Sequence, residues 1–338
     1  RESEDDWLRE AQAERRRPLD AVRGPLMRAT WLRGAAASDV LLIVHHCLCD
    51  GLAVAALLRD LLRLCERPDA DIGGYVGLPD PIAWLPDEIL RDHGLRRSIR
   101  IRAALFRAGI RLCRPGAPRR YGEQYLFQWT LGTSVTAALR DRCRQAGVTL
   151  SAGLVAAFQL AFLDVAGPRG LDRIAVAVNP RRYLKKLPAD AFFAMAPTVK
   201  FSGRRLASRE VWTQARALGA VLDHGFLRAA ADLFRNMLVL EHLHGVFDRL
   251  LGFSRSLRGG RNLIFSNLGQ LDLAADYGEF RLEAVHAHMA MLSPTTAHLL
   301  ACTGYGGKLE FCFMSDDISL PRAKADAIRQ RAMALLVE

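Results

Sequence analysis

The chain has 338 residues, a formal net charge of +11 and apolar residues at half of its positions. This length is too great for one compact core and suits two subdomains. No uninterrupted apolar stretch approaches the roughly 18–20 residues that a membrane span needs. Seven scattered cysteines, an odd number, indicate a reducing, cytoplasmic compartment rather than a disulfide framework.

The positive charge is carried mostly by arginine, and it favours anionic partners such as nucleic acid, phospholipid, coenzyme phosphates or an acidic carrier protein. No zinc-finger spacing, aromatic RNA-binding signature or phosphate-binding loop accompanies it, so we expect no nucleic-acid partner. A GC-rich genome would give the same excess of arginine. The chain begins at Arg1, inside a charged segment, and we interpret it as a partial or trimmed chain.

Strand-like runs alternate with helical stretches, and this order predicts an α/β fold or an α+β sandwich. We expect strands at 26–32 and 40–44, a helix at 51–65 and a loop rich in Pro and Gly at 67–86. A basic helix at 95–114, a strand at 124–131, helices at 133–147 and 149–167, and a strand at 173–179 follow. Two helices within 208–251, a strand within 261–273 that leads into a turn, strands at 280–291, 298–303 and 308–313, and a helix from 320 complete the chain. We expect Thr133 or Ser134 to cap the helix that ends at Gly147.

The helix at 95–114 is amphipathic. One stripe is apolar and consists of Leu95, Ile99, Ala103, Phe106, Ile110 and Cys113, and five arginines lie beside and opposite it. Such a helix can lie on an anionic membrane or dock an acidic partner. The alternative is a linker helix with a solvated face.

The stretch "VLLIVHHCLCDG" places His45, His46 and Asp50 at the end of an apolar strand, followed by a helix. Three interpretations compete: a metal site, a structural pair of buried histidines and an acid–base centre. A continuing strand would put His45, Cys47 and Cys49 on one face and His46 on the other. The Cys-x-Cys spacing also does not favour zinc, and we expect no metal.

The other two interpretations stay open on the residues alone. A buried histidine is commonly hydrogen-bonded to backbone, but a strand end is a natural place for a cleft. There, a histidine held in one orientation can act as a base near neutral pH. Gly51 in the Asp-Gly turn permits a backbone conformation that other residues resist.

The motif "HHCLCDG" resembles the HHxxxDG motif of the CoA- and carrier-protein-dependent acyltransferases. This superfamily includes chloramphenicol acetyltransferase-like enzymes, nonribosomal peptide condensation domains, wax-ester synthases and polyketide-associated acyltransferases. The segments "RRRPLDAVRGPLMRATWL", "LRDRCRQAGVTLSAGLVAAFQLAF", "AVAVNPRRYL" and "NLIFSNLGQLDL" resemble family segments in the same order.

The resemblance implies roles for individual residues. His46 would be the catalytic general base, with His45 packing beneath it. Asp50 would be structural and pair with Arg181, or alternatively with Arg182, while Gly51 would let the backbone approach the substrate. Ser266 and Asn267 are candidates for stabilising the oxyanion or positioning the substrate, and turn chemistry is their alternative role.

The resemblance also implies an architecture of two chloramphenicol acetyltransferase-like subdomains in a V, with a tunnel between them. We expect residues 1–94 to be the remainder of the N-terminal subdomain, 95–120 a basic linker helix and 121–338 the C-terminal subdomain. Family length implies that roughly 80–100 residues of the N-terminal subdomain are absent, within the size of a subdomain portion.

The implied activity is transfer of an acyl group from acyl-CoA, or from an acyl carrier protein, to a hydroxyl. We expect no bound cofactor, because the CoA- or phosphopantetheine-linked acyl group is the substrate. The absence of the DFGWG motif, of an adenylation signature and of a carrier-protein serine motif favours a stand-alone enzyme. The alternatives are an amide-forming condensation domain with an amine acceptor, and a catalytically silent carrier-protein docking module. A binder of nucleic acid or membrane surfaces, driven by the basic helix, is the third.

Overall fold

The computed structural model describes residues 1–20, 22–73, 81–114, 116, 122–188, 191–194, 196–256, 261–289 and 298–337. They form two compact units, each assembled from separate segments. The first unit contains Arg1–Pro81, Leu187–Ala196 and Leu273–Glu283, and the second contains Ile82–Lys186, Pro197–Asp272 and Ala284–Glu338.

The first unit is built from helix α1 (Asp6–Arg15), strands β1 (Met27–Leu32) and β2 (Asp39–Val44), and helix α2 (Gly51–Glu66). The two strands pair antiparallel. Buried Glu14 of α1 accepts hydrogen bonds from Arg28 of β1 at 2.7 and 3.0 Å, so a charged pair ties this helix to the hairpin.

The second unit contains one six-stranded sheet. Its strands are β3 (Gln124–Leu131), β4 (Arg173–Ala177), β5 (Thr198–Ser202), β6 (Asn262–Gln270), β7 (His298–Tyr305) and β8 (Lys308–Asp316). They are ordered β3-β8-β7-β6-β4-β5. Strands β4, β6 and β7 run parallel, and the other neighbouring pairs are antiparallel.

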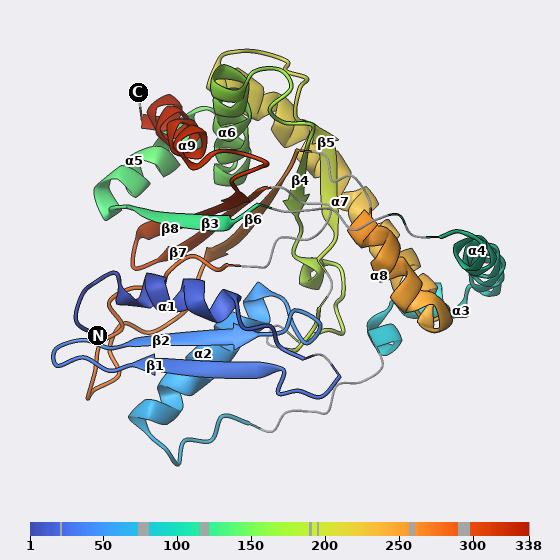
Figure 1. Ribbon diagram of the computed structural model, residues 1–338, viewed down its shortest axis with the longest axis horizontal. Helices are drawn as coiled ribbons and strands as arrows, with labels where there is room; N and C mark the ends of the chain where they lie inside the picture. Colours follow the sequence, from blue (N-terminus) through green and yellow to red (C-terminus); the bar gives the residue numbers. More distant parts are fainter. Residues whose placement is uncertain are drawn as a thin grey trace. The chain divides into compact units, whose positions relative to one another are not determined.

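The helices of this unit are α3 (Asp87–Arg91), α4 (His93–Leu112), α5 (Thr133–Gln145), α6 (Leu150–Ala166), α7 (Val211–Leu240), α8 (Phe247–Ser256) and α9 (Arg322–Val337). Short 3-10 helices occupy Pro81–Trp84, Pro180–Arg182 and His244–Val246. Figure 1 shows α6 and α9 together over one side of the sheet.

Helix α6 forms the centre of the core. It is apolar on all sides and is buried without a break from Ala152 to Phe162, as expected for a helix enclosed by other elements. Thr149 caps its start by accepting a hydrogen bond from the backbone of Ala152 at 3.1 Å. Gly167 ends it with a φ of +74°, a conformation that favours glycine.

The sheet therefore has two different faces. The helix face carries aromatic side chains that pack against α6 and α9, with Trp129 stacked on Phe311 at 5.0 Å. Residues of the opposite face alternate with these along each strand. We call it the polar face, after Gln128, Thr130, Ser266, Thr303 and Glu310.

Several expectations from the sequence differ from the structure. The strand expected at 280–291 is wrong: Arg281 makes an isolated bridge with Asp276, residues 282–289 lie in no strand, and 290–291 lie outside the described residues. Helix α1 and strand β5 were not expected. Helix α5 begins at Thr133 after Gly132 and has no side-chain cap.

Among the described residues, no single helix combines the length and the apolar composition needed to cross a membrane. Only α5 and α6 taken together pass that test, and they are bent by 96° relative to each other.

Candidate active site

The two histidines lie in the short connection between β2 and α2. Strand β2 ends at Val44, and the backbone N–H of His45 still donates to the carbonyl of Leu26 at 2.8 Å. Residues 46–48 then form a turn. The alternation of faces considered for residues 45–49 does not apply, because the strand does not continue through them.

The His46 ring is held by the main chain. Its Nδ1 lies 2.8 Å from the carbonyl oxygen of Cys49. A carbonyl oxygen only accepts hydrogen bonds, so Nδ1 must carry the hydrogen. In the neutral imidazole, Nε2 then has the unshared electron pair. The His46 residue is exposed, and this geometry presents Nε2 as a base.

His45 plays a different part in the same turn. Its Nδ1 accepts a hydrogen bond of 3.2 Å from the backbone N–H of Cys47, and the residue is half-buried. The histidine that follows the strand therefore helps to shape the turn that carries its neighbour. This local role is compatible with the packing role predicted for it.

Asp50 organises the start of α2. Its Oδ1 accepts a hydrogen bond of 3.0 Å from the backbone of Ala53, and its own N–H donates to the carbonyl of Phe193 at 2.9 Å. Gly51 is the first residue of α2 and is not among the glycines with positive φ. Gly51 therefore does not use the positive-φ conformation that glycine permits, and its role in letting the backbone approach the substrate stays a prediction.

Arg181 and Arg182 lie in the 3-10 helix of the second unit. The side chain of Asn179 caps this turn by accepting from the backbone of Arg181 at 3.0 Å. Arg181 is half-buried and Arg182 is exposed. Asp50 belongs to the first unit, and its pairing with Arg181 stays a prediction.

Ser266 and Asn267 follow each other in β6, so their side chains lie on opposite faces of the sheet. The amide of Asn267 donates to the hydroxyl of Ser151 in α6 at 3.1 Å, on the helix face. The hydroxyl of Ser266 lies on the polar face. The two residues do not form one donor pair.

Two residues that sequence reasoning missed contact each other beside Ser266. Nε2 of His288 lies 2.9 Å from Ser266 Oγ, and its Nδ1 lies 3.4 Å from Thr303 Oγ1. The "HAH" sequence at 286–288 was interpreted as part of a strand. No local pattern indicates that this segment contacts β6 and β7, because the contact depends on the tertiary fold.

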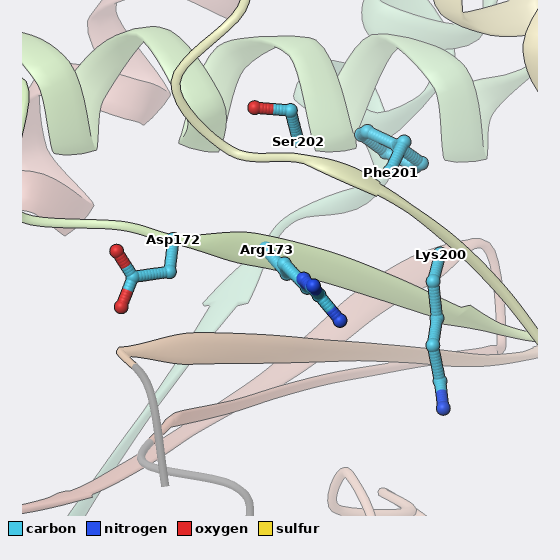
Figure 2. A pocket seen from close by; sticks show the side chains of 5 residues that line it. All are labelled: Asp172, Arg173, Lys200, Phe201 and Ser202. Carbon is cyan, nitrogen blue, oxygen red and sulfur yellow. The ribbon is translucent and has the colours of Figure 1, made fainter.

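A hollow of about 260 Å³ lies at the edge of the sheet, lined by Asp172, Arg173, Lys200, Phe201 and Ser202. Figure 2 shows Arg173 and Lys200 projecting to the same side of β4 and β5. Burial alone would raise the pKa of Asp172, but hydrogen bonds from Arg204 and Arg261 outweigh it and lower that pKa. None of the site residues predicted from the sequence lines this hollow.

The described residues contain no group of three or more His, Cys, Asp or Glu side chains that could hold a metal ion. The side chains described around His46 and Ser266 can donate and accept hydrogen bonds, and the histidines can transfer protons.

In sequence, no protein-family model matches the chain. One of the linear gramicidin synthase proteins of Brevibacillus parabrevis is 31% identical over 172 residues, which make up 45% of this chain and 3% of that protein. The chain thus corresponds to a very small part of this relative.

In structure, the chain resembles TRI3 trichothecene 15-O-acetyltransferase from Fusarium sporotrichioides, with a TM-score of 0.65 and 14% identity, over 98% of this chain and 74% of that one. It also resembles the first condensation domain of the CDA synthetase, with a TM-score of 0.61 and 17% identity, over 98% of this chain and 71% of that one. At such low identity, these likenesses establish the fold alone.

Proposed function

We propose that this chain, which belongs by its fold to the superfamily of condensation domains and chloramphenicol acetyltransferase-like acyltransferases, is an acyltransferase that forms an ester. The acyl group would come from a CoA or acyl-carrier-protein thioester, and a hydroxyl group would accept it. The observation that carries this proposal is the hydrogen bond from His46 Nδ1 to the Cys49 carbonyl, which leaves Nε2 as the base.

The proposed reaction uses His46 twice. Nε2 takes the proton of the acceptor hydroxyl while the hydroxyl oxygen attacks the thioester carbonyl carbon. The resulting tetrahedral intermediate collapses, its carbon–sulfur bond breaks, and the imidazolium returns the proton to the departing thiolate. The products are an ester and a free thiol, so proton and electrons balance within the site. General-base help of this kind is typically worth about 10²–10⁴-fold in rate.

Other residues would support that step. The Asp50 cap fixes the start of α2 and, with it, the turn that holds His46. We propose that Ser266 donates a hydrogen bond to the oxyanion of the tetrahedral intermediate. The role proposed for Asn267 becomes indirect, since its side chain contacts Ser151 on the helix face. We further propose the V-shaped pair of subdomains, with thioester and acceptor entering a tunnel between them.

An amide-forming condensation domain is the second candidate. The relative with 31% identity is a linear gramicidin synthase, and a solved condensation domain shares the fold. An amine acceptor would use the same base in the same way. The TRI3 protein shares the fold as well, and it is a 15-O-acetyltransferase, which favours the ester.

The decisive experiment measures free-thiol release from acyl-CoAs and acyl-pantetheines, with alcohols or amines as acceptors. Wild type is compared with His46→Ala and with His224→Ala, a control at another exposed histidine, on α7. We expect acceptor-dependent release that falls at least about 10²-fold in His46→Ala and is unchanged in the control.

The acceptor that supports release would decide between ester and amide formation. Circular dichroism shows whether both variants are folded. Equal release in wild type and His46→Ala would contradict the proposed function. Carrier-protein binding without any turnover would favour a silent docking module.

A membrane contact is proposed from helix α4. Of the apolar stripe predicted from the sequence, Ile99 and Ala103 are buried, whereas Phe106 is 47% exposed. A second stripe lies on the opposite side, where Ile101, Leu105 and Leu112 are 52%, 68% and 86% exposed. Exposed arginines flank this second stripe, at positions 97, 100, 102 and 111. Apolar insertion beside cationic side chains fits an anionic lipid surface.

A further inference from the structure

Residues 284–289 cross the polar face of the sheet instead of adding a strand to it. We call them the crossing segment. The carbonyl of Ala287 accepts from Gln128 of β3 at 3.2 Å. His286 Nδ1 lies 3.9 Å from the carboxylate of Glu310 on β8. His288 contacts β6 and β7, so the segment contacts four neighbouring strands.

His288 lies between two hydroxyl groups on that face. Its Nε2 is 2.9 Å from Ser266 Oγ, and its Nδ1 is 3.4 Å from Thr303 Oγ1. A neutral imidazole donates from one ring nitrogen and accepts at the other. Whichever nitrogen carries the hydrogen therefore decides whether Ser266 donates to the ring or accepts from it.

The burial of Thr303 favours one of the two arrangements. Thr303 is 1% exposed, and a buried hydroxyl needs an acceptor for its hydrogen. The Nδ1 atom of His288 provides that acceptor if it is unprotonated. Nε2 then carries the hydrogen and donates it to Ser266 Oγ, and the Ser266 hydrogen is left to point elsewhere.

We propose that His288 is a positioning residue that keeps Ser266 as a hydrogen-bond donor to the substrate. This inference rests on the proposed function, in which the Ser266 hydroxyl stabilises the oxyanion formed from the thioester. Thr303 sets the tautomer of His288, His288 occupies the acceptor side of Ser266 Oγ, and the serine hydrogen is directed at the substrate oxygen. No bond is made or broken in this chain of hydrogen bonds.

The opposite tautomer would give a different chemistry. With the hydrogen on Nδ1, Ser266 would donate to Nε2 and become an activated nucleophile. It would lose its proton to His288 and attack the thioester carbon; the carbon–sulfur bond would then break, the His288 imidazolium would return the proton to the departing thiolate, and an acyl-serine would remain. An acyl adduct on Ser266 would therefore overturn the proposal.

The first test reads the tautomer directly and does not need activity. ¹⁵N NMR of the histidine side chains separates a protonated nitrogen from an unprotonated one, and His288→Gln identifies the signals by their loss. We expect Nε2–H and unprotonated Nδ1 for His288 near pH 8. The reverse pattern would overturn the proposal, whatever the fate of the proposed function.

The second test is kinetic and uses thiol release with the acceptor found for wild type. Removing one oxyanion donor typically costs about 10²–10³-fold in kcat. We expect kcat to fall about 10²–10³-fold in Ser266→Ala and about 10–10²-fold in His288→Ala. The KM should change little in either variant. The double variant should be no slower than Ser266→Ala, and His288→Gln, whose amide can donate, should recover most of the rate.

The control is His286→Ala, which removes the other histidine of the crossing segment but leaves the Ser266 contact in place. It should keep near wild-type kcat. Losses that multiply in the double variant, or no recovery by glutamine, would assign His288 a structural role instead. Turnover that does not depend on His46 would contradict the proposed function. The NMR result would still decide the tautomer of His288, because it does not depend on turnover.

Discussion

The side-chain amide of Gln214 donates a hydrogen bond of 2.8 Å to the side-chain oxygen of Gln159, and both residues are almost fully buried. Gln159 in turn donates to the carbonyls of Ser202, Gly203 and Arg205 at 3.0–3.2 Å. One buried amide pair thus joins α6 and α7 to the loop that follows β5.

Replacing Gln159 with leucine should therefore destabilise the second unit. Leucine preserves volume but leaves buried carbonyls and the Gln214 amide without their partner, at about 1–3 kcal/mol for each unsatisfied group. We expect a loss of at least about 3 kcal/mol in the free energy of unfolding. Denaturant titration measures it, with exposed Gln330→Ala as control. A loss within about 0.5 kcal/mol, usual for surface changes, would contradict the prediction.

Asparagine at position 50 separates the two roles of Asp50. It keeps an oxygen that can cap α2 but removes the charge predicted to pair with Arg181. If that buried pair forms, Asp50→Asn should cost about 3 kcal/mol, and Asp50→Ala about 1 kcal/mol more for the lost cap. Thermal or chemical unfolding measures both losses.

The partner is identified by a double variant. Asp50→Asn with Arg181→Gln should lose less stability than the sum of the two single changes. If the single losses simply add, Asp50 pairs with another group. If Asp50→Asn is as stable as wild type, capping alone explains the residue.

Alkylation of Cys47 should abolish the proposed thiol release. This thiol is exposed and lies next to His46, whereas burial raises the pKa of Cys302 to about 12 and keeps it unreactive. Iodoacetamide at pH 8 should modify Cys47 and reduce thiol release. Cys47→Ser should resist inactivation, although exposed Cys65 and Cys113 still react. Equal inactivation of wild type and variant would show that another cysteine is responsible.

The stability of the second unit should decline above pH 10. Burial raises the pKa of Tyr125 from 10.0 to about 12. Because the folded pKa lies above the unfolded one, this stabilisation is complete below pH 10 and is lost as pH rises from 10 toward 12. Unfolding titrations of wild type and Tyr125→Phe across this range should converge as the pH rises. A constant difference between the two would contradict the prediction.

The exposed stripe of α4 should bind anionic vesicles. Changing Ile101, Leu105 and Leu112 to serine should abolish sedimentation with vesicles rich in phosphatidylserine, while thiol release from soluble acyl-CoA stays unchanged. Binding should fall with salt, because the flanking arginines contribute electrostatic attraction. The control exchanges three exposed polar residues of the same unit, Asp141, Arg144 and Gln330, for serine. Equal binding of both triple variants would exclude this surface.

Periodicity predicted the elements whose pattern is strong. The strand at Gln124–Leu131 has the expected bounds, and α2 and α6 differ from expectation by about one residue at their ends. Helix α1 was missed because half of its ten residues are charged, and the five-residue strand β5 was missed as well. Residues 280–291 alternate like a strand, but residues 284–289 cross the sheet instead, held by contacts from distant residues.

The candidate site also contains residues that the sequence predicts and contacts that it does not predict. The motif named His46 and Asp50, because their positions follow from neighbours in sequence. The mutual contacts of Ser266, His288 and Thr303 follow only from the pairing of β6 with β7 and from the path of the crossing segment. Sequence reasoning could name the serine but not the groups that orient it.

The acceptor for His46 is a main-chain oxygen, and this decides which substitutions the turn can tolerate. Replacing the side chain of Leu48 or Cys49 leaves that oxygen on the chain, so the ring keeps its hydrogen bond wherever the turn keeps its shape. Nε2 of His46 therefore stays the unprotonated nitrogen when these side chains change. Half-buried Leu48 can therefore change in size or polarity without removing the acceptor of the ring, whereas the side chain of Cys49 is buried.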